Sequence, residues 1–454
     1  MKTMNARQID MTQRDIFPAI IAFAVPLLIS SLLQTFYNTV DSIIIGQFVS
    51  TDALAAVGAC NSPMMLLQSI MLGLSGGMTV LISQMFGVGQ MDEVKEAVST
   101  VNSFFVLSVI PITLIALLLV NPLLSLIDIH DSSRSYAFQY LIIVFSGLIG
   151  SFGYNLNSGL LRGLGDSRSP LIFLLIACLV NIVLDLVFVL LLNRGVFGVA
   201  IATVIAQMVS WIYSQWHIRK HYPFLDYKLF RIAVNPVHLK RFMSLSVPMV
   251  SNHAIFSLGF LLYYRFVNGF GPVFMAGYSI AGKIENLIWQ PVSSLGTTAV
   301  TFAGQNCGAG NLRGIKRGAK IILRTAVIFN VAASMIGLIF GRKLLALFTP
   351  DAAVVEAGYL YLRCLNPFYW IYAFIHILGS IMNGVGDVKI PTISNMVMFW
   401  GVRLPVAWYF STHFGESVLY YCFPISWVAG FTITVSYYLS GRWKQKVLKK
   451  TERY

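Results

Sequence analysis

Charged side chains are scarce in this chain. Only 11% of its 454 residues are Asp, Glu, Lys or Arg, whereas 57% are hydrophobic. A water-soluble globular domain carries about a quarter charged residues, so the composition excludes that class. Apolar runs of about twenty residues recur along the chain, and this is the length that crosses a bilayer as a helix. Ten-residue segments of alternating polarity, which are typical of a membrane barrel, are missing. The sequence therefore predicts a helical integral membrane protein.

Cysteine and the common catalytic motifs are scarce too. The chain contains no Walker loop, zinc motif or nucleophile elbow, which argues against ATP hydrolysis, zinc chemistry and acyl transfer. The first fifteen residues are polar and no small-residue cleavage site follows them, so we expect no removable signal peptide. We predict a protein that is not an enzyme and that needs no cofactor. The five cysteines are odd in number, scattered and mostly in apolar runs, which favours a packing role over disulfides: Cys60, Cys178, Cys307, Cys364 and Cys422.

Acidic residues are outnumbered by basic ones, 18 against 32, which leaves a net charge of +14. The distribution of this charge argues against a nucleic-acid partner. With the N-terminus placed in the cytoplasm, most Lys and Arg residues fall in loops on the cytoplasmic side, as the positive-inside rule requires. We therefore expect a multi-pass protein of the cytoplasmic membrane, surrounded by the lipid bilayer, with both termini in the cytoplasm.

The chain is an internal duplication. Gly163-Leu164-Gly165-Asp166 corresponds to Gly384-Val385-Gly386-Asp387, and Pro170 corresponds to Pro391, each 221 residues further on. Repeated halves of this kind are common in carriers that form a site between two helical bundles. The predicted fold class is an all-α integral membrane protein with twelve transmembrane helices in two six-helix bundles related by an internal repeat. We predict an N-terminal bundle over 1–218, a cytoplasmic linker over 219–239 and a C-terminal bundle over 240–454.

Acidic residues lie inside apolar segments only in the first half. The first predicted span carries four polar residues at the spacing i, i+3, i+4, i+7, which is one face of a helix: Gln34, Tyr37, Asn38 and Asp41. The fifth span carries Asn181 and Asp185, again four apart. A charged Asp near the middle of a membrane helix costs about 3 kcal/mol to insert. We therefore expect these carboxylates to have partners and a function.

Neutral oxygens accompany the carboxylates in the same half, on Asn157 and Thr203. This set has the composition of a site for a hard cation. It also suits a proton, because two neighbouring carboxyl groups in a poorly solvated place resist double ionisation. The simpler alternative is that these groups only join helices by hydrogen bonds. The repeat argues against that alternative for the carboxylates, because Asp41 corresponds to Tyr263 and Asp185 to Val406.

Other residues are candidates for a substrate cavity between the two bundles, which we expect to be lined by aromatic and Met side chains with few polar anchors. Glu285 either lines this cavity or anchors a helix end, and Arg403 lies deep enough to reach it. The full set of cavity candidates is Gln34, Met64, Met71, Phe256, Tyr263, Tyr278, Glu285, Phe368, Tyr372 and Arg403.

The run from Val25 to Gly46 (VPLLISSLLQTFYNTVDSIIIG), the segment Gly304–Asn311 and the two Gly-x-Gly-Asp loops resemble the multidrug and toxic compound extrusion (MATE) family of efflux carriers. The resemblance covers nearly the whole chain. It implies a secondary antiporter that acts as a monomer and expels a small molecule, usually an amphipathic organic cation, as Na⁺ or H⁺ enters. It does not choose between the two ions.

Within that family, the first half is similar to the DinF-like branch. This similarity implies a cation site formed by Asp41, Asn181, Asp185 and Thr203, with Tyr37 and Asn157 nearby. The NorM-like branch carries further carboxylates in its seventh and tenth helices. The corresponding places here are Phe256 and Tyr372, which argues against that second mode of coupling.

Two other functions fit parts of the pattern. A lipid or lipid-linked oligosaccharide flippase of the same superfamily would share the duplicated bundles, but we would expect more basic residues in its cavity. Gly-x-Gly-Asp also occurs in intramembrane aspartyl proteases. Here both copies precede polar residues and a proline, which is typical of a loop turn at a helix start.

Overall fold

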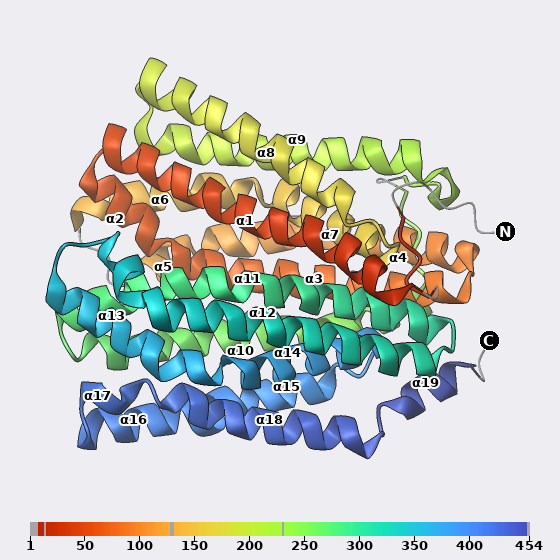
Figure 1. The fold of residues 1–454 in the computed structure, drawn as a ribbon. Helices are drawn as coiled ribbons and strands as arrows, with labels where there is room; N and C mark the ends of the chain where they lie inside the picture. Colours follow the sequence, from red (N-terminus) through yellow and green to blue (C-terminus); the bar gives the residue numbers. More distant parts are fainter. Residues whose placement is uncertain (1–7, 13–14, 128–130, 229–230, 452–454) are drawn as a thin grey trace. The chain divides into compact units, whose positions relative to one another are not determined.

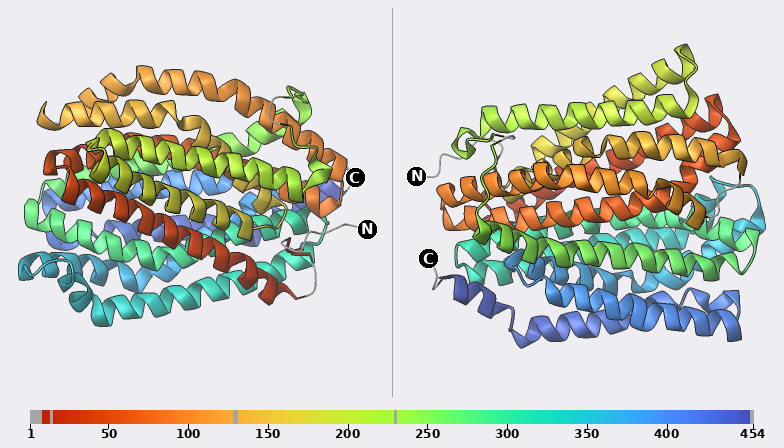
Figure 2. Two further views of the ribbon diagram at one scale, coloured as in Figure 1. Left: turned by 90° about the horizontal axis from the view of Figure 1, so that it is seen from above. Right: turned by 180° about the vertical axis from the view of Figure 1, so that it is seen from behind.

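The computed structural model describes residues 8–12, 15–127, 131–228 and 231–451, and these form helices and turns without any strand (Figures 1 and 2). Contacts divide the chain into two compact units. The first unit comprises Met1–Ile9 and Ile29–Val250, and the second comprises Asp10–Leu28 and Ser251–Tyr454. Helices α1 and α10 therefore contribute residues to both units. The functional boundaries predicted from the sequence remain a prediction.

The first unit contains most of α1 and the start of α10. Its helices are α1 (Ile16–Phe48), α2 (Thr51–Ala59), α3 (Asn61–Val88), α4 (Met91–Leu118), α5 (Val120–Ile127), α6 (Asp131–Ser146), α7 (Leu148–Gly163), α8 (Arg168–Leu186), a π-helical turn (Val187–Leu191), α9 (Gly195–His221), a 3₁₀ turn (Pro223–Leu225) and α10 (Pro236–Asn268).

The second unit continues from α10. Its helices are α11 (Pro272–Gly308), α12 (Leu312–Ala346), α13 (Ala352–Leu365), a 3₁₀ turn (Asn366–Phe368), α14 (Tyr369–Val385), α15 (Lys389–Met396), a π-helical segment (Val397–Arg403), α16 (Leu404–His413), α17 (Glu416–Leu419), α18 (Cys422–Ser440) and α19 (Lys444–Thr451).

The described residues include nine helical segments long and apolar enough to cross a membrane. The bent pair α6 and α7, with an angle of 51° between its helices, makes a tenth. Helix α11 and the segment from α15 to α16 account for the two other spans that the sequence predicts. Both are interrupted by charge, Lys283 and Glu285 in the first and Arg403 in the second. The prediction of an all-helical membrane protein is confirmed.

The Gly-x-Gly-Asp loops form matching turns in the two units. Gly165 and Gly386 have φ angles of 89° and 87°, a conformation that glycine adopts without strain. The N–H of Asp166 donates to the carbonyl of Leu161 at 2.8 Å, and Asp387 makes the corresponding bond at 2.9 Å. The turn accordingly ends one helix and starts the next in each copy of the repeat.

The segment after α9 packs onto the first unit. Tyr222 and Tyr227 are buried, and the Tyr222 hydroxyl donates to Asp166 Oδ2 at 2.7 Å. Further on, Ser103 on α4 accepts the N–H of Ala233 at 2.9 Å. These bonds hold the predicted linker against α4 and α7, so this segment belongs structurally to the first unit.

Candidate functional site

The acidic cluster predicted in the first half forms where α1, α8 and α9 meet. Asp41 lies on α1, Asn181 and Asp185 lie one turn apart on α8, and Thr203 lies on α9. Asn181 and Asp185 are fully buried. A one-turn spacing on α8 directs both of its side chains toward the same neighbour, which is α1.

Asn181 bridges the two carboxylates. With its amide nitrogen facing them, it donates to Asp41 Oδ1 at 2.9 Å and to Asp185 Oδ2 at 3.1 Å. This orientation is assigned from the hydrogen-bond network, because the opposite one would direct its oxygen at two acceptors. The second oxygen of Asp185, Oδ1, is buried and has no hydrogen-bond partner among the described residues. A buried carboxylate oxygen without a partner is costly, so it is a natural place for a cation or a proton.

Tyr37 and Thr203 border the cluster. Tyr37 is buried one turn before Asp41, and its hydroxyl lies 3.5 Å from Thr203 Oγ1. The Thr203 hydroxyl donates to the carbonyl of Val199 at 3.0 Å, so its oxygen lone pairs can accept the hydroxyl of Tyr37. The structure thus brings together five of the six residues predicted for the cation site: Tyr37, Asp41, Asn181, Asp185 and Thr203.

Asn157, the sixth predicted residue, lies in another network. Its amide donates to Ser214 at 2.8 Å and accepts the Tyr227 hydroxyl at 2.8 Å. Asn157 lies six residues before the end of α7, whereas Asp185 lies seventeen residues beyond the start of α8. At 1.5 Å per residue, their depths differ by about 17 Å. The described hydrogen bonds of Asn157 therefore join α7 to α9 and to the segment after α9, away from the carboxylates.

Two features of the cluster were missed by sequence reasoning. Tyr140 on α6 packs against the buried side chains that follow the carboxylates on α1 and α8, among them Ile44 and Val189. An aromatic residue in an apolar helix carries no signal of its own, so only the packing of α6 could have identified it. The other feature is the π-helical turn Val187–Leu191, directly after Asp185. Turns of this kind are often found at functional sites.

In the second unit the corresponding places hold no acid. Tyr263, which occupies the place of Asp41, is fully buried against Tyr278 and Phe423 at ring centroid distances of 6.0 and 5.0 Å. Val402 and Val406 occupy the places of Asn181 and Asp185. The second copy therefore packs without carboxylates at these matched places, so the fold does not require an acid there.

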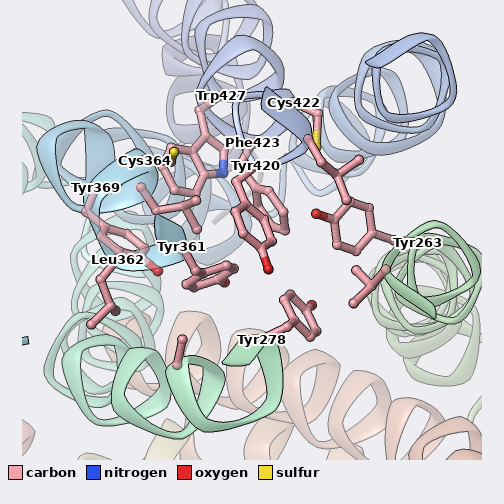
Figure 3. Close-up of a cluster of buried hydrophobic side chains, with 14 of the residues drawn as sticks. Tyr263, Tyr278, Tyr361, Leu362, Cys364, Tyr369, Tyr420, Cys422, Phe423 and Trp427 are labelled. Atoms are coloured by element: carbon pink, nitrogen blue, oxygen red, sulfur yellow. The ribbon is translucent and has the colours of Figure 1, made fainter. Parts of the chain in front are cut away.

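Several of the predicted cavity residues gather in one aromatic cluster of the second unit (Figure 3). Tyr361 donates a hydrogen bond to Glu285 within this cluster. Arg403 is buried; its Nε donates to Ser426 at 3.1 Å, and its guanidinium carbon lies 4.3 Å from the ring centroids of Phe399 and Phe423. Figure 3 shows the hydroxyls of Tyr263 and Tyr420 among the neighbouring rings, so this cluster is aromatic and also polar.

The other cavity candidates lie at the edge of this cluster or in the first unit. Tyr372 packs against the cluster and stacks on its Trp427 at 5.5 Å, and Phe256 packs against Phe399 at 5.2 Å. In the first unit, Gln34 donates to Asn38 at 3.5 Å, and Met64 is half-buried near the start of α3. Their role in binding a substrate remains a prediction.

The two Gly-x-Gly-Asp carboxylates serve as structural acceptors. Asp166 accepts the N–H groups of Arg168 and Ser169 at 3.0 and 2.9 Å, together with the hydroxyl of Tyr222. Asp387 accepts the Tyr437 hydroxyl at 2.5 Å. Asp166 thus caps the start of α8, and Asp387 ties its turn to α18. Both roles agree with the loop-turn interpretation rather than with a protease.

These observations define a class: a multi-pass helical membrane protein of two repeated halves, with a buried acidic cluster in the first. The MatE family model matches residues 26–187 and 248–409, one match in each half. The chain therefore belongs to the MatE family, the multidrug and toxic compound extrusion transporters, and the predicted resemblance and internal repeat are confirmed. Its assignment to the DinF-like branch remains a prediction.

Two relatives are similar to this chain over nearly the whole length of both sequences. The chain is 27% identical to "Probable multidrug resistance protein YpnP" of Bacillus subtilis, covering 96% of this chain and 97% of the relative. It is 25% identical to "Probable multidrug resistance protein NorM" of Thermotoga maritima, covering 96% and 94%.

A solved structure shares the fold. The outward-facing conformation of a multidrug resistance MATE family transporter of the MOP superfamily superimposes with a TM-score of 0.89 at 20% identity, covering 99% of this chain and 100% of the other.

Proposed function

We propose that this chain is a secondary antiporter that exports amphipathic organic compounds across the cytoplasmic membrane in exchange for Na⁺ or H⁺. The observation that carries the proposal is the bridge from Asn181 to Asp41 and Asp185, beside a buried Asp185 oxygen that has no hydrogen-bond partner among the residues that the structure describes. Two carboxylates held this close in a buried place favour the uptake of one positive charge.

Cation uptake would act on the packing of three helices. Without a cation, the negative charges of Asp41 and Asp185 repel each other, and the Asn181 amide donates to both. A bound cation cancels one of the two charges, which ends their mutual repulsion and favours closer packing of α1 against α8 and α9. Substrate and cation then compete through two packings of the first unit, without touching each other.

The two candidate ions use the same residues differently. A proton binds one carboxylate and leaves the Asn181 amide in its present orientation. Na⁺ prefers oxygen ligands, so the Asn181 amide must rotate to present its oxygen, and the lone pairs of Thr203 add a further ligand. Asn181→Asp, which removes the donor and adds an oxygen, should therefore impair Na⁺ coupling and H⁺ coupling to different degrees.

Substrate recognition is proposed for aromatic residues with few polar anchors. The cluster around Glu285 and Arg403 supplies such a surface, because aromatic faces attract organic cations and a carboxylate adds charge. The names of the relatives, which are multidrug resistance proteins, support drugs as substrates. They do not favour the flippase alternative.

The proposal is tested by transport into everted membrane vesicles. An imposed Na⁺ gradient or pH gradient should drive the uptake of a fluorescent organic cation, and only one of the two gradients should be needed. Asp41→Asn should abolish uptake, whereas Tyr263→Phe, at the matching place in the second unit, should retain it. Uptake that is insensitive to both gradients would contradict an antiporter.

Both termini are proposed to lie in the cytoplasm. A single cysteine placed at Lys228, in a chain whose five native cysteines are replaced by serine or alanine, should react with a membrane-impermeant maleimide only after the cells are permeabilised. A cysteine at Arg194, between α8 and α9, should react in intact cells and serves as the control. Labelling at Lys228 from outside would reverse the topology.

A further inference from the structure

A basic pocket lies at one end of the second unit, where α12 begins and α18 gives way to α19. It has a volume of about 350 Å³. Its lining combines three lysines with apolar and aromatic side chains: Lys316, Ala319, Lys320, Leu323, Leu378, Tyr438, Leu439, Trp443 and Lys444. Figure 1 shows α19 following α18 at the end of the chain. Neither the coupling site nor the aromatic cluster includes any of these residues.

The lining of this pocket carries three positive charges and no negative one. Lys316 and Lys320 are one turn apart on α12 and exposed, and Lys444 starts α19. The helices that supply the lining, α12, α14, α18 and α19, contain no Asp or Glu. No ion pair joins these three lysines to an acidic residue in the part of the chain that the structure describes. Three cations in one pocket attract an anion that carries several oxygens.

The walls of the pocket combine aromatic and aliphatic side chains, as is typical of proteins at the membrane interface. Trp443 is buried, stacks on Tyr438 at a ring centroid distance of 5.2 Å and donates to the carbonyl of Tyr438 at 2.9 Å. Leu439 beside them is 74% exposed, and Leu448 on α19 is 54% exposed. Aromatic and basic residues next to exposed leucines at the end of a span are typical of the headgroup layer.

The length of α12 places the lysines at this level. The helix has 35 residues, which corresponds to about 52 Å, whereas the hydrocarbon core is about 30 Å thick. The stretch between Arg324 and Arg342 is uncharged and fits the core, so the first turns, with Lys316 and Lys320, extend beyond it. Leu323, one turn further along, and Leu378 on α14 lie on the side toward the acyl chains.

We propose that this pocket binds an anionic phospholipid of the membrane leaflet that faces it. The phosphate would lie among Lys316, Lys320 and Lys444, and the first acyl carbons would lie along Leu323, Leu378 and Leu439. The apolar half of the lining favours a lipid over a soluble phosphate, which would leave it exposed to water. The site shares no residue with the proposed ion-coupling site, so a test of lipid binding is separate from a test of the proposed transport function.

Lipid binding to the purified full-length protein tests this assignment. Native mass spectrometry is performed after titration with phosphatidylglycerol and with phosphatidylcholine of identical acyl chains. The wild-type protein should bind phosphatidylglycerol more tightly than phosphatidylcholine. The triple variant Lys316→Gln, Lys320→Gln, Lys444→Gln should bind it about a hundredfold more weakly, since each basic residue near an anionic lipid surface contributes about fivefold. Unchanged binding in the triple variant would overturn the site.

A matched variant controls for general charge. Arg313→Gln, Arg317→Gln, Lys446→Gln removes the same charge from exposed positions outside the pocket. It should retain the preference for phosphatidylglycerol, and an equal loss would show a diffuse attraction instead of a pocket. Inorganic phosphate at millimolar concentration should fail to displace the lipid. Displacement would identify a soluble phosphate as the ligand and overturn the lipid assignment.

Discussion

The two units have the same scaffold but different chemistry. The place of Asp41 in the first unit is taken by the buried Tyr263 in the second, and Asn181 and Asp185 are replaced by Val402 and Val406. The two copies arose by duplication and keep the same fold. A residue that is present in one copy and absent from the matched position of the other is therefore not needed for folding and points to function. The comparison supports the proposed role of the carboxylates in ion coupling.

The largest expected effect comes from removing the charge on α1. Asp41→Asn should abolish uphill efflux, a loss of coupling of about 5- to 150-fold, while expression stays normal because a costly buried charge is gone. Efflux of a fluorescent cation from proteoliposomes, with a fixed ion gradient, measures this. A wild-type efflux rate in this variant would contradict a role of Asp41 in ion coupling.

Asp185→Asn should have the same effect or a slightly smaller one. The amide still accepts a hydrogen bond from Asn181, but the pair then carries a single charge and attracts a cation more weakly. The ion concentration that gives half-maximal efflux should rise by about tenfold or more, the equivalent of 1.4 kcal/mol. An unchanged half-maximal concentration would show that Asp41 acts alone.

The converse experiment places an acid in the second unit. Val406→Asp introduces a carboxylate where no Asn181 counterpart exists, so we expect a loss of stability of about 3 kcal/mol without a second coupling site. The melting temperature, followed by size-exclusion chromatography after heating, should fall clearly below that of Val406→Asn. Equal melting temperatures for the two variants would show that the second unit tolerates a charge there as well as the first unit does.

Glu285 should affect substrate choice without affecting coupling. Glu285→Gln keeps the shape of the side chain and its contact with Tyr361 but removes the charge. We expect KM to rise by about tenfold for cationic substrates, as for one charged contact, and to stay unchanged for neutral ones. If the variant lost uphill transport of every substrate, the result would indicate that ion coupling depends on Glu285 in the second unit.

The smallest effect is expected for Tyr263→Phe. The Tyr263 hydroxyl is buried without a hydrogen-bond partner of ordinary geometry among the described residues. Its removal should leave efflux unchanged and stability unchanged or slightly higher, because an unsatisfied buried group costs about 1 to 3 kcal/mol. A melting temperature several degrees lower would reveal a partner for this hydroxyl.

Much of the site could be predicted from spacing and from the duplication. A four-residue interval placed Asn181 and Asp185 on one face of a helix, and the expense of burying a charge implied that Asp41 has a partner. Asn157 was grouped with them as a neutral oxygen of the same half, although its place six residues before the end of α7 puts it at a different depth. Tyr140 was missed because an aromatic residue in an apolar helix carries no signal of its own.

The division of α1 and α10 between the two units could not be predicted from the sequence either. Both helices read as single apolar runs, but their first parts belong by contacts to a different unit from the rest. The segment after α9 looked like a polar linker because it is rich in charge. Its tyrosines are instead buried against α4 and α7, and no periodic pattern in so short a segment signals such packing.

The most direct test of the account is the ion released when substrate binds. Purified protein in weakly buffered detergent, or equilibrated with radioactive Na⁺, is mixed with a saturating organic cation, and the displaced H⁺ or Na⁺ is counted per chain. The account predicts about one ion released by the wild type and by Tyr263→Phe, and none by Asp41→Asn. The same release from Asp41→Asn as from the wild type would contradict coupling through the first unit.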